Sequence, residues 1–209
     1  MYHKQLFLAD AIRLRDKISA VMPRWYRAMP SLEGEFEYGF TMYENARQSA
    51  LGMLVLGSEA LRTDNKLLVN LGVTAVTTVA PAASAIATAG SAASTTQGAV
   101  LNEQYWWPFF NDCWVMGGVH GRQQFHLASV DWPPNTDLWD RRNRRPTMLG
   151  RELLILSISG YVLRRTPGLG MVFYNDDHMK AFGLRLANIY ALDPGDDEAA
   201  FVARIKAAF

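Results

Sequence analysis

A run without charged side chains extends from Leu67 to Asn102, and it constrains the fold of this chain more than any other feature. The middle of this run consists almost entirely of Ala, Val, Thr, Ser and Gly. Small side chains let helix backbones approach one another closely. Three interpretations follow: an Ala-rich helix pair in a soluble core, a weakly hydrophobic segment that enters a membrane, or a flexible spacer between a delivery region and an active domain.

The position of Pro81 within this run predicts two helices rather than one over residues 67–93. Proline removes a backbone donor and clashes with the preceding turn, so the two helices should meet there and pack by their Ala and Gly faces. Thr, Ser and Gly lower the hydrophobicity of the run, and Pro81 interrupts it. If the run enters a membrane, these features favour conditional insertion over a permanent anchor.

A Ser-, Thr- and Gly-rich stretch from Gly90 to Gly98 supplies the predicted domain boundary. The expected units are a helical region over 1–100, which contains the uncharged segment 67–102, and a mixed α/β domain over 101–209 as the candidate active domain. We expect an α+β fold whose C-terminal half holds a β-hairpin, a central buried helix and a further strand.

Composition narrows the functional classes. The chain has 209 residues, 49% of them hydrophobic and 20% charged, which is typical of a globular protein with a substantial core. A formal net charge of +1 disfavours a strongly basic nucleic-acid-binding protein. The single cysteine, Cys113, excludes an internal disulfide and is interpreted as a small core residue.

The N-terminal sequence does not fit a cleaved signal peptide. Asp10, Arg13 and Arg15 stand where such a signal needs an uninterrupted apolar stretch. We therefore expect a location in the cytoplasm of the producing cell, with any export using another route and with conditional membrane association through 67–102.

Hydrophobic periodicity predicts two helices before the uncharged run. The first spans residues 3–22, with an apolar stripe that includes Leu6, Ala9 and Ile12. The second is capped by Ser31 and carries a stripe that continues as far as Leu54.

The C-terminal half begins with an aromatic block and then alternates element types. Residues 113–129 are predicted to form a β-hairpin whose turn is centred on Gly121. A largely apolar helix follows from a Thr147 cap to Arg165. The remaining predicted elements are a strand over 169–174, a helix over 177–191 and an amphipathic helix over 196–209.

His126 is the predicted catalytic acid or base. In the predicted hairpin it lies opposite Gly117, where a missing side chain would leave room for a ligand. Asp112 and Glu152 are the carboxylates that would orient the imidazole, so the candidate catalytic residues are His126, Glu152 and Asp112. The competing interpretation is a hydrogen-bonded, partly buried histidine with a structural role.

No metal site and no cofactor are predicted. The histidines at 3, 120, 126 and 178 show no ligand spacing such as a pair four residues apart on a helix.

One basic cluster, Arg141, Arg142, Arg144 and Arg145, precedes the helix that Thr147 caps. Guanidinium groups beside free backbone N–H groups favour an anion, so Arg144, Arg145 and Arg151 are the predicted substrate-binding residues. The alternative is a loop whose arginines are neutralised by Asp131, Asp137 and Asp140.

These features favour a bacterial effector or toxin whose C-terminal domain acts on a nucleotide or RNA by acid–base chemistry. The layout is similar to that of interbacterial toxins in architecture only, without a shared motif. Such a protein would have an immunity or chaperone protein as its partner. The alternatives are a non-enzymatic protein that inserts into a membrane or binds a partner through 67–102, and a soluble oligomeric structural component.

Overall fold

A computed structural model describes residues 2–21, 33–48, 53–56, 107–127, 132, 138–142, 144–167, 170–192, 194–195 and 197–209. Several predicted features lie outside these residues. They are the uncharged run 67–102 with its two helices at Pro81, the Ser31 cap and the domain boundary near residue 100.

Both predicted N-terminal helices are present, as α1 (Lys4–Val21) and α2 (Glu33–Arg47). The predicted stripe of α1 is wrong at two positions, because Ala9 is exposed and Ile12 is 46% exposed, whereas Leu6 is partly buried against the core. The buried face carries Phe7, Ala11 and Leu14, which recur at four- and three-residue steps.

The second helix is shorter than the stripe predicted. α2 ends at Arg47, and Leu54 belongs to strand β1 (Met53–Leu56). The side chain of Leu54 is buried, so it contributes to the core from β1 and not from the helix.

A four-stranded sheet joins segments far apart in the sequence. Its order is β1, β2 (Gln124–Leu127), β6 (Gly170–Asn175) and β5 (Tyr161–Thr166). β1 runs parallel to β2, and β6 runs antiparallel to both β2 and β5. Together with the helices, these antiparallel strands confirm the predicted α+β fold class. The strand predicted over 169–174 is β6.

The hairpin predicted over 113–129 is wrong in position. Residues Trp107–His120 form helix α6, and only the second predicted strand exists, as β2. Gly117, read as the partner of His126, faces α2, where a Cβ atom would clash with the backbone of Tyr43. His126 pairs with Val55 on one side and Val172 on the other. The β-hairpin of the C-terminal half is formed by β5 and β6.

The central buried helix is α7 (Met148–Ile158). Thr147 caps it as predicted, since its hydroxyl oxygen accepts a hydrogen bond from the N–H of Gly150 at 3.1 Å. The predicted continuation to Arg165 is wrong. Gly160 has φ of +74°, which ends the helix, and the chain enters β5 at Tyr161.

The helix predicted over 177–191 is two short helices, α8 (His178–Gly183) and α9 (Leu186–Tyr190). They are separated at Leu184, whose backbone is extended and whose side chain is buried. The last predicted helix is α10 (Glu198–Ala208), which buries Phe201 and Ile205. A small two-stranded pair, β3 (Trp139–Asp140) with β4 (Arg145–Pro146), precedes α7.

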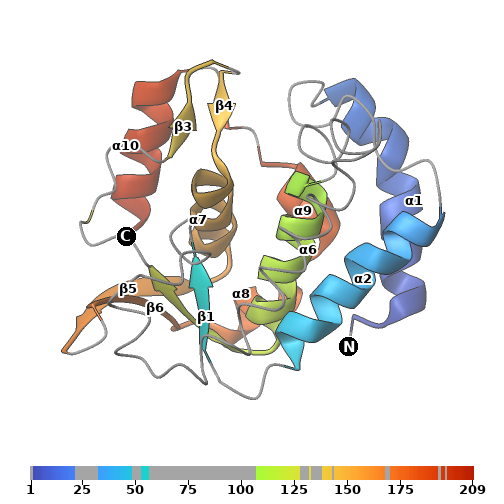
Figure 1. Ribbon diagram of the computed structural model, residues 1–209, viewed down its shortest axis with the longest axis horizontal. Coiled ribbons are helices and arrows are strands. Elements are labelled where there is room, and N and C mark those ends of the chain that lie inside the picture. Colours follow the sequence, from blue (N-terminus) through green and yellow to red (C-terminus); the bar gives the residue numbers. More distant parts are fainter. Residues whose placement is uncertain are drawn as a thin grey trace, which may run out of the picture.

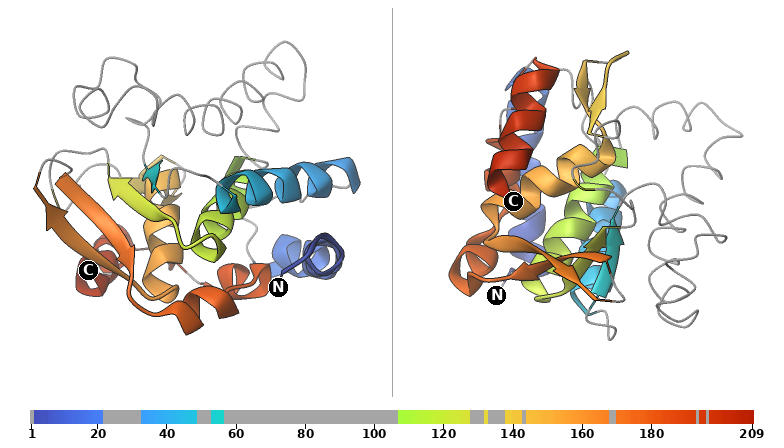
Figure 2. Two further views of the ribbon diagram at one scale, coloured as in Figure 1. Left: turned by 90° about the horizontal axis from the view of Figure 1, so that it is seen from below. Right: turned by 90° about the vertical axis from the view of Figure 1, so that its left-hand side faces the viewer.

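α7 lies between α10 on one side and α6 on the other, with α2 and then α1 beyond α6 (Figure 1). The β5–β6 hairpin lies at the end of the molecule away from α1 and α2 (Figures 1 and 2). Within the described ranges, no helix combines the length and apolarity that crossing a bilayer requires.

Candidate functional site

The three predicted catalytic residues lie in the protein interior. His126 and Asp112 have no exposed surface, and Glu152 is 5% exposed. They come from three different elements, β2, α6 and α7 respectively.

The structure does join Asp112 to Arg151, one of the predicted substrate-binding residues. The guanidinium Nε of Arg151 donates to both carboxylate oxygens of Asp112 at 3.2 Å. A terminal nitrogen of Arg151 donates to the carbonyl of Ile189 at 3.2 Å, and the guanidinium carbon lies 5.8 Å from the centre of the Tyr190 ring. This buried ion pair therefore joins α6, α7 and α9.

The arginine loop is surrounded by acidic side chains. Arg141 makes two hydrogen bonds to Glu198, at 2.8 and 2.9 Å, and Arg145 lies 3.9 Å from Asp140. Arg144 is exposed and has a positive φ of 51°. The positive charge of this loop is thus partly compensated within the protein.

A different set of polar groups meets where α2 crosses the end of α6. The hydroxyl of Tyr43 lies 2.8 Å from Nδ1 of His120, and Nε2 of His120 lies 2.9 Å from the carbonyl oxygen of Leu184. A carbonyl only accepts, so Nε2 carries a hydrogen. Burial lowers the pKa of His120 and favours the neutral ring, in which Nδ1 accepts from the Tyr43 hydroxyl.

Two glycines allow this close crossing. Added Cβ atoms at Gly117 and Gly121 would clash with the backbones of Tyr43 and Arg47 respectively. Gly117 and Gly121 are four residues apart, and so are Tyr43 and Arg47. One face of α6, including its C-terminal end, therefore rests directly on one face of α2. The side chains of Tyr43 and Arg47 are thereby set beside His120.

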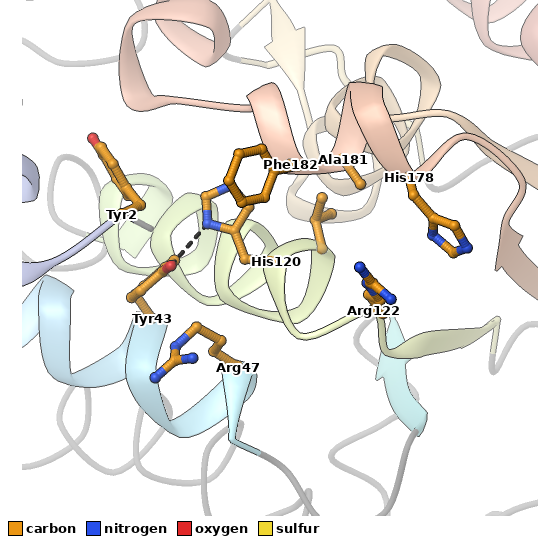
Figure 3. Close-up of a pocket in the computed structure, with 9 residues that line it drawn as sticks. Tyr2, Tyr43, Arg47, His120, Arg122, His178, Ala181 and Phe182 are labelled. Atoms are coloured by element: carbon orange, nitrogen blue, oxygen red, sulfur yellow. Dashed lines mark hydrogen bonds between the residues drawn. The ribbon is translucent and has the colours of Figure 1, made fainter.

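A pocket of about 220 Å³ opens at this crossing (Figure 3). It is lined from the chain start, α2, the end of α6, and α8. Its lining residues are Tyr2, Tyr43, Arg47, Val119, His120, Arg122, His178, Ala181 and Phe182. Two are arginines, two are histidines, and none is an aspartate or glutamate.

The two arginines differ in how their charge is compensated. Arg47 donates from Nε and a terminal nitrogen to the two carboxylate oxygens of Glu44, both at 2.8 Å. These hydrogen bonds lower the pKa of Glu44 and raise that of Arg47. Arg122 is exposed, and no acidic group in the described parts of the chain lies within ion-pairing distance of it.

Arg122 also has an unusual backbone. The N–H of Gln123 bonds to the carbonyl of Gly118 at 2.9 Å, and the N–H of Arg122 to that of Val119 at 3.1 Å. This is the Schellman pattern at a helix end, in which the residue at the position of Arg122 is left-handed and is usually glycine. Arg122 has φ of 57° there. A side chain at this position costs about 1 kcal/mol in backbone strain.

One wall of the pocket is fixed by a charged cluster. The hydroxyl of Tyr2 donates to Asp10 at 2.8 Å, and Arg185 donates to both oxygens of the same carboxylate at 2.7 to 3.0 Å. The Tyr2 ring centre lies 5.8 Å from that of His120. Burial and the neighbouring carboxylate raise the pKa of Tyr2, so its hydroxyl stays neutral.

None of the six predicted site residues lines this pocket. Sequence reasoning placed His120 and Arg122 in a hairpin turn and gave Tyr43 and Arg47 no role beyond the helix. Two sequence features could have indicated these pocket residues. One is Gly121 followed by a basic residue, as at a helix end, and the other is the four-residue spacing of Tyr43 and Arg47.

Comparisons with protein-family models, with curated proteins and with solved structures find no match for this chain.

Proposed function

We propose that this protein binds a phosphate-bearing small molecule in the pocket between α2, the end of α6, and α8. The observation that carries this proposal is the charge of the lining: two guanidinium groups and two imidazoles without a carboxylate. Arginine binds phosphate through parallel N–H donors, and such charge-assisted hydrogen bonds are about twice as strong as neutral ones.

Arg122 is the principal anion-binding residue in this proposal. It lacks an acidic partner within the described ranges, whereas Arg47 is held by Glu44. It also occupies a left-handed position where glycine would be less strained, at φ of 57°. Strain retained at a pocket is a reason to look for a functional side chain there.

Tyr43 and His120 give the pocket a group that exchanges protons. With a neutral His120, the Tyr43 hydrogen is directed to Nδ1, so the hydroxyl oxygen can only accept from a ligand. When Nδ1 takes up a proton it becomes the donor, and the Tyr43 hydroxyl is released to donate to an anion. Anion binding and protonation of His120 should therefore favour each other.

The proposed ligand is phosphate-bearing, as expected from the sequence, but the proposed site is at His120 and not at His126. The effector or toxin role, the immunity or chaperone partner, and export remain predictions. So does catalysis by His126 with Asp112 and Glu152.

Two glycine substitutions test the site. Arg122→Gly removes one of the two guanidinium groups of the pocket and relieves a positive φ. Arg144→Gly removes a guanidinium group and relieves a φ of 51° in the arginine loop, outside the pocket lining. Isothermal titration calorimetry with inorganic phosphate at low salt is the measurement. We expect Arg122→Gly to weaken phosphate binding about tenfold or more, because a lost charge-assisted hydrogen bond is worth about 1.5–3 kcal/mol.

Arg144→Gly should bind phosphate like the wild type. Equal binding by Arg122→Gly and wild type would contradict the proposal. Loss of binding in Arg144→Gly alone would place the anion in the arginine loop, as the sequence predicted.

A further inference from the structure

The short helix α8 exposes two large apolar side chains, Phe182 at 68% and Met179 at 78%. Only Phe182 also lines the pocket. Figure 3 shows its ring beside the other pocket residues, above the end of α6. An exposed aromatic ring at the rim of a cationic pocket can stack against a flat group of a bound ligand.

The position of Phe182 is fixed by its helix. The side chain of Asp177 caps α8 by accepting from the N–H groups of Met179 and Lys180, both at 3.1 Å. Ala181 in this helix and Leu184 at its C-cap are both buried. The Leu184 carbonyl holds His120 at 2.9 Å, so α8 and the floor of the pocket are joined directly. The ring is thus presented by an anchored element.

We propose, on the basis of the phosphate site described above, that the ligand is a nucleoside monophosphate whose base stacks on Phe182. The phosphate would lie against Arg122, and the flat base would cover the exposed ring. Stacking of a base on an aromatic side chain strengthens binding and tolerates any of the four bases, because every base has a π face.

The size of the pocket supports one nucleotide rather than a dinucleotide. Its volume of about 220 Å³ lies below the roughly 300–1,000 Å³ of pockets that enclose a drug-sized ligand. A phosphate fits inside such a volume, and the base then extends over the rim, where Phe182 stands 68% exposed.

Calorimetric titrations of the full chain with inorganic phosphate and with the four nucleoside 5′-monophosphates test this inference. For the wild type we expect at least one nucleotide to bind about tenfold more tightly than phosphate. Phe182→Ala should lower the affinity for that nucleotide to the affinity for phosphate, and the affinity for phosphate itself should not change. Phe182→Trp should retain the advantage, and Phe182→Leu should lose it.

Met179→Ala is the matched control, because Met179 is on the same helix and is also largely exposed but does not line the pocket. It should bind nucleotide like the wild type. Equal affinity of wild type for phosphate and all four nucleotides would overturn the stacking inference and leave the phosphate site intact. Equal losses in Phe182→Ala and Met179→Ala would also overturn it, in favour of a broader apolar contact across α8. Binding of neither phosphate nor nucleotide would overturn the proposed function itself.

Discussion

Tyr43 and His120 are 77 positions apart in the sequence, and the hydroxyl of one lies 2.8 Å from the imidazole Nδ1 of the other. Because Nε2 of the same ring bonds to the Leu184 carbonyl, this histidine connects α2, α6 and the end of α8. His120 therefore joins these elements, and in the proposed function it is also the group that exchanges protons in the pocket.

Tyr43→Phe should lower the free energy of unfolding by about 1–3 kcal/mol, because Nδ1 of the partly buried His120 loses its partner. Urea denaturation followed by circular dichroism measures this change. Tyr161→Phe is the control, since its buried hydroxyl donates to the Gln123 carbonyl at 2.8 Å and Tyr161 does not line the pocket. Both variants should be destabilised, but only Tyr43→Phe should alter phosphate binding. Altered binding in both would show that stability, and not the Tyr43 hydroxyl, controls affinity.

Stability should fall as pH drops below about 6.5, the usual pKa of histidine in an unfolded chain. Burial lowers the pKa of His120 in the folded protein, so the unfolded chain binds the proton first as pH falls. The loss continues until pH passes the lowered folded pKa. Unfolding free energies measured between pH 7.5 and 5 should show a weaker slope in His120→Asn than in wild type; identical slopes would contradict this assignment.

Bound anion should oppose that loss, because it favours the protonated form of His120. Sulfate is a suitable probe, since its charge does not change over this pH range. The increase in melting temperature caused by sulfate should be larger at pH 5.5 than at pH 7.5 in wild type and should lose this pH dependence in His120→Asn. A sulfate effect that is independent of pH in wild type would separate the anion from His120.

Gly117→Ala should destabilise the protein by about 1–3 kcal/mol by forcing α6 away from the Tyr43 backbone. Gly183→Ala in α8 is the matched control. Nothing lies within 4 Å of a Cβ atom there, so alanine should be neutral or stabilising by up to about 1 kcal/mol. Chemical denaturation of the two variants gives the comparison, and a Gly117→Ala protein as stable as wild type would mean that the helices can separate without cost.

Asp112→Asn should lower the unfolding free energy by about 3–5 kcal/mol, since it leaves the Arg151 charge buried beside a neutral amide. Glu198→Gln breaks an ion pair to Arg141, whose side chain is 82% exposed, and should cause no measurable change. This pair of variants also tests the catalytic role predicted for Asp112. A stable but inactive Asp112→Asn protein would support catalysis, whereas strong destabilisation identifies a structural ion pair.

Elements with local signals were predictable from the sequence. Thr147 and the apolar run after it indicated α7, and the spacing of Phe201 and Ile205 indicated α10. Both depend on contacts within a few residues, such as the Thr147 hydroxyl accepting from the Gly150 N–H. Strand β6 was found for the same reason, since a short apolar segment after a proline and glycine turn is a local pattern.

The helix α6 was not predictable in this way. The sequence placed Gly117 in a hairpin strand. Gly117 and Gly118 are glycines because Tyr43, Leu54 and Phe125 come too close for a Cβ atom. That reason depends on segments far away in the sequence. The pocket was missed with it, because His120 acquires its partners only once α2 and α8 have packed against α6.

The parallel pairing of β1 with β2 determines how this chain can be dissected. A fragment that begins near residue 101 would lack β1, leaving the β2 edge with unpaired backbone groups beside the buried side chains of Phe125 and Leu127. It would also lack α2, exposing the apolar face of α6 around Phe109 and Cys113. Open strand edges next to apolar surface favour aggregation. Expression of the C-terminal half alone therefore calls for residues 33–56 to be supplied as well, as a co-expressed segment or through a shortened connection to α6.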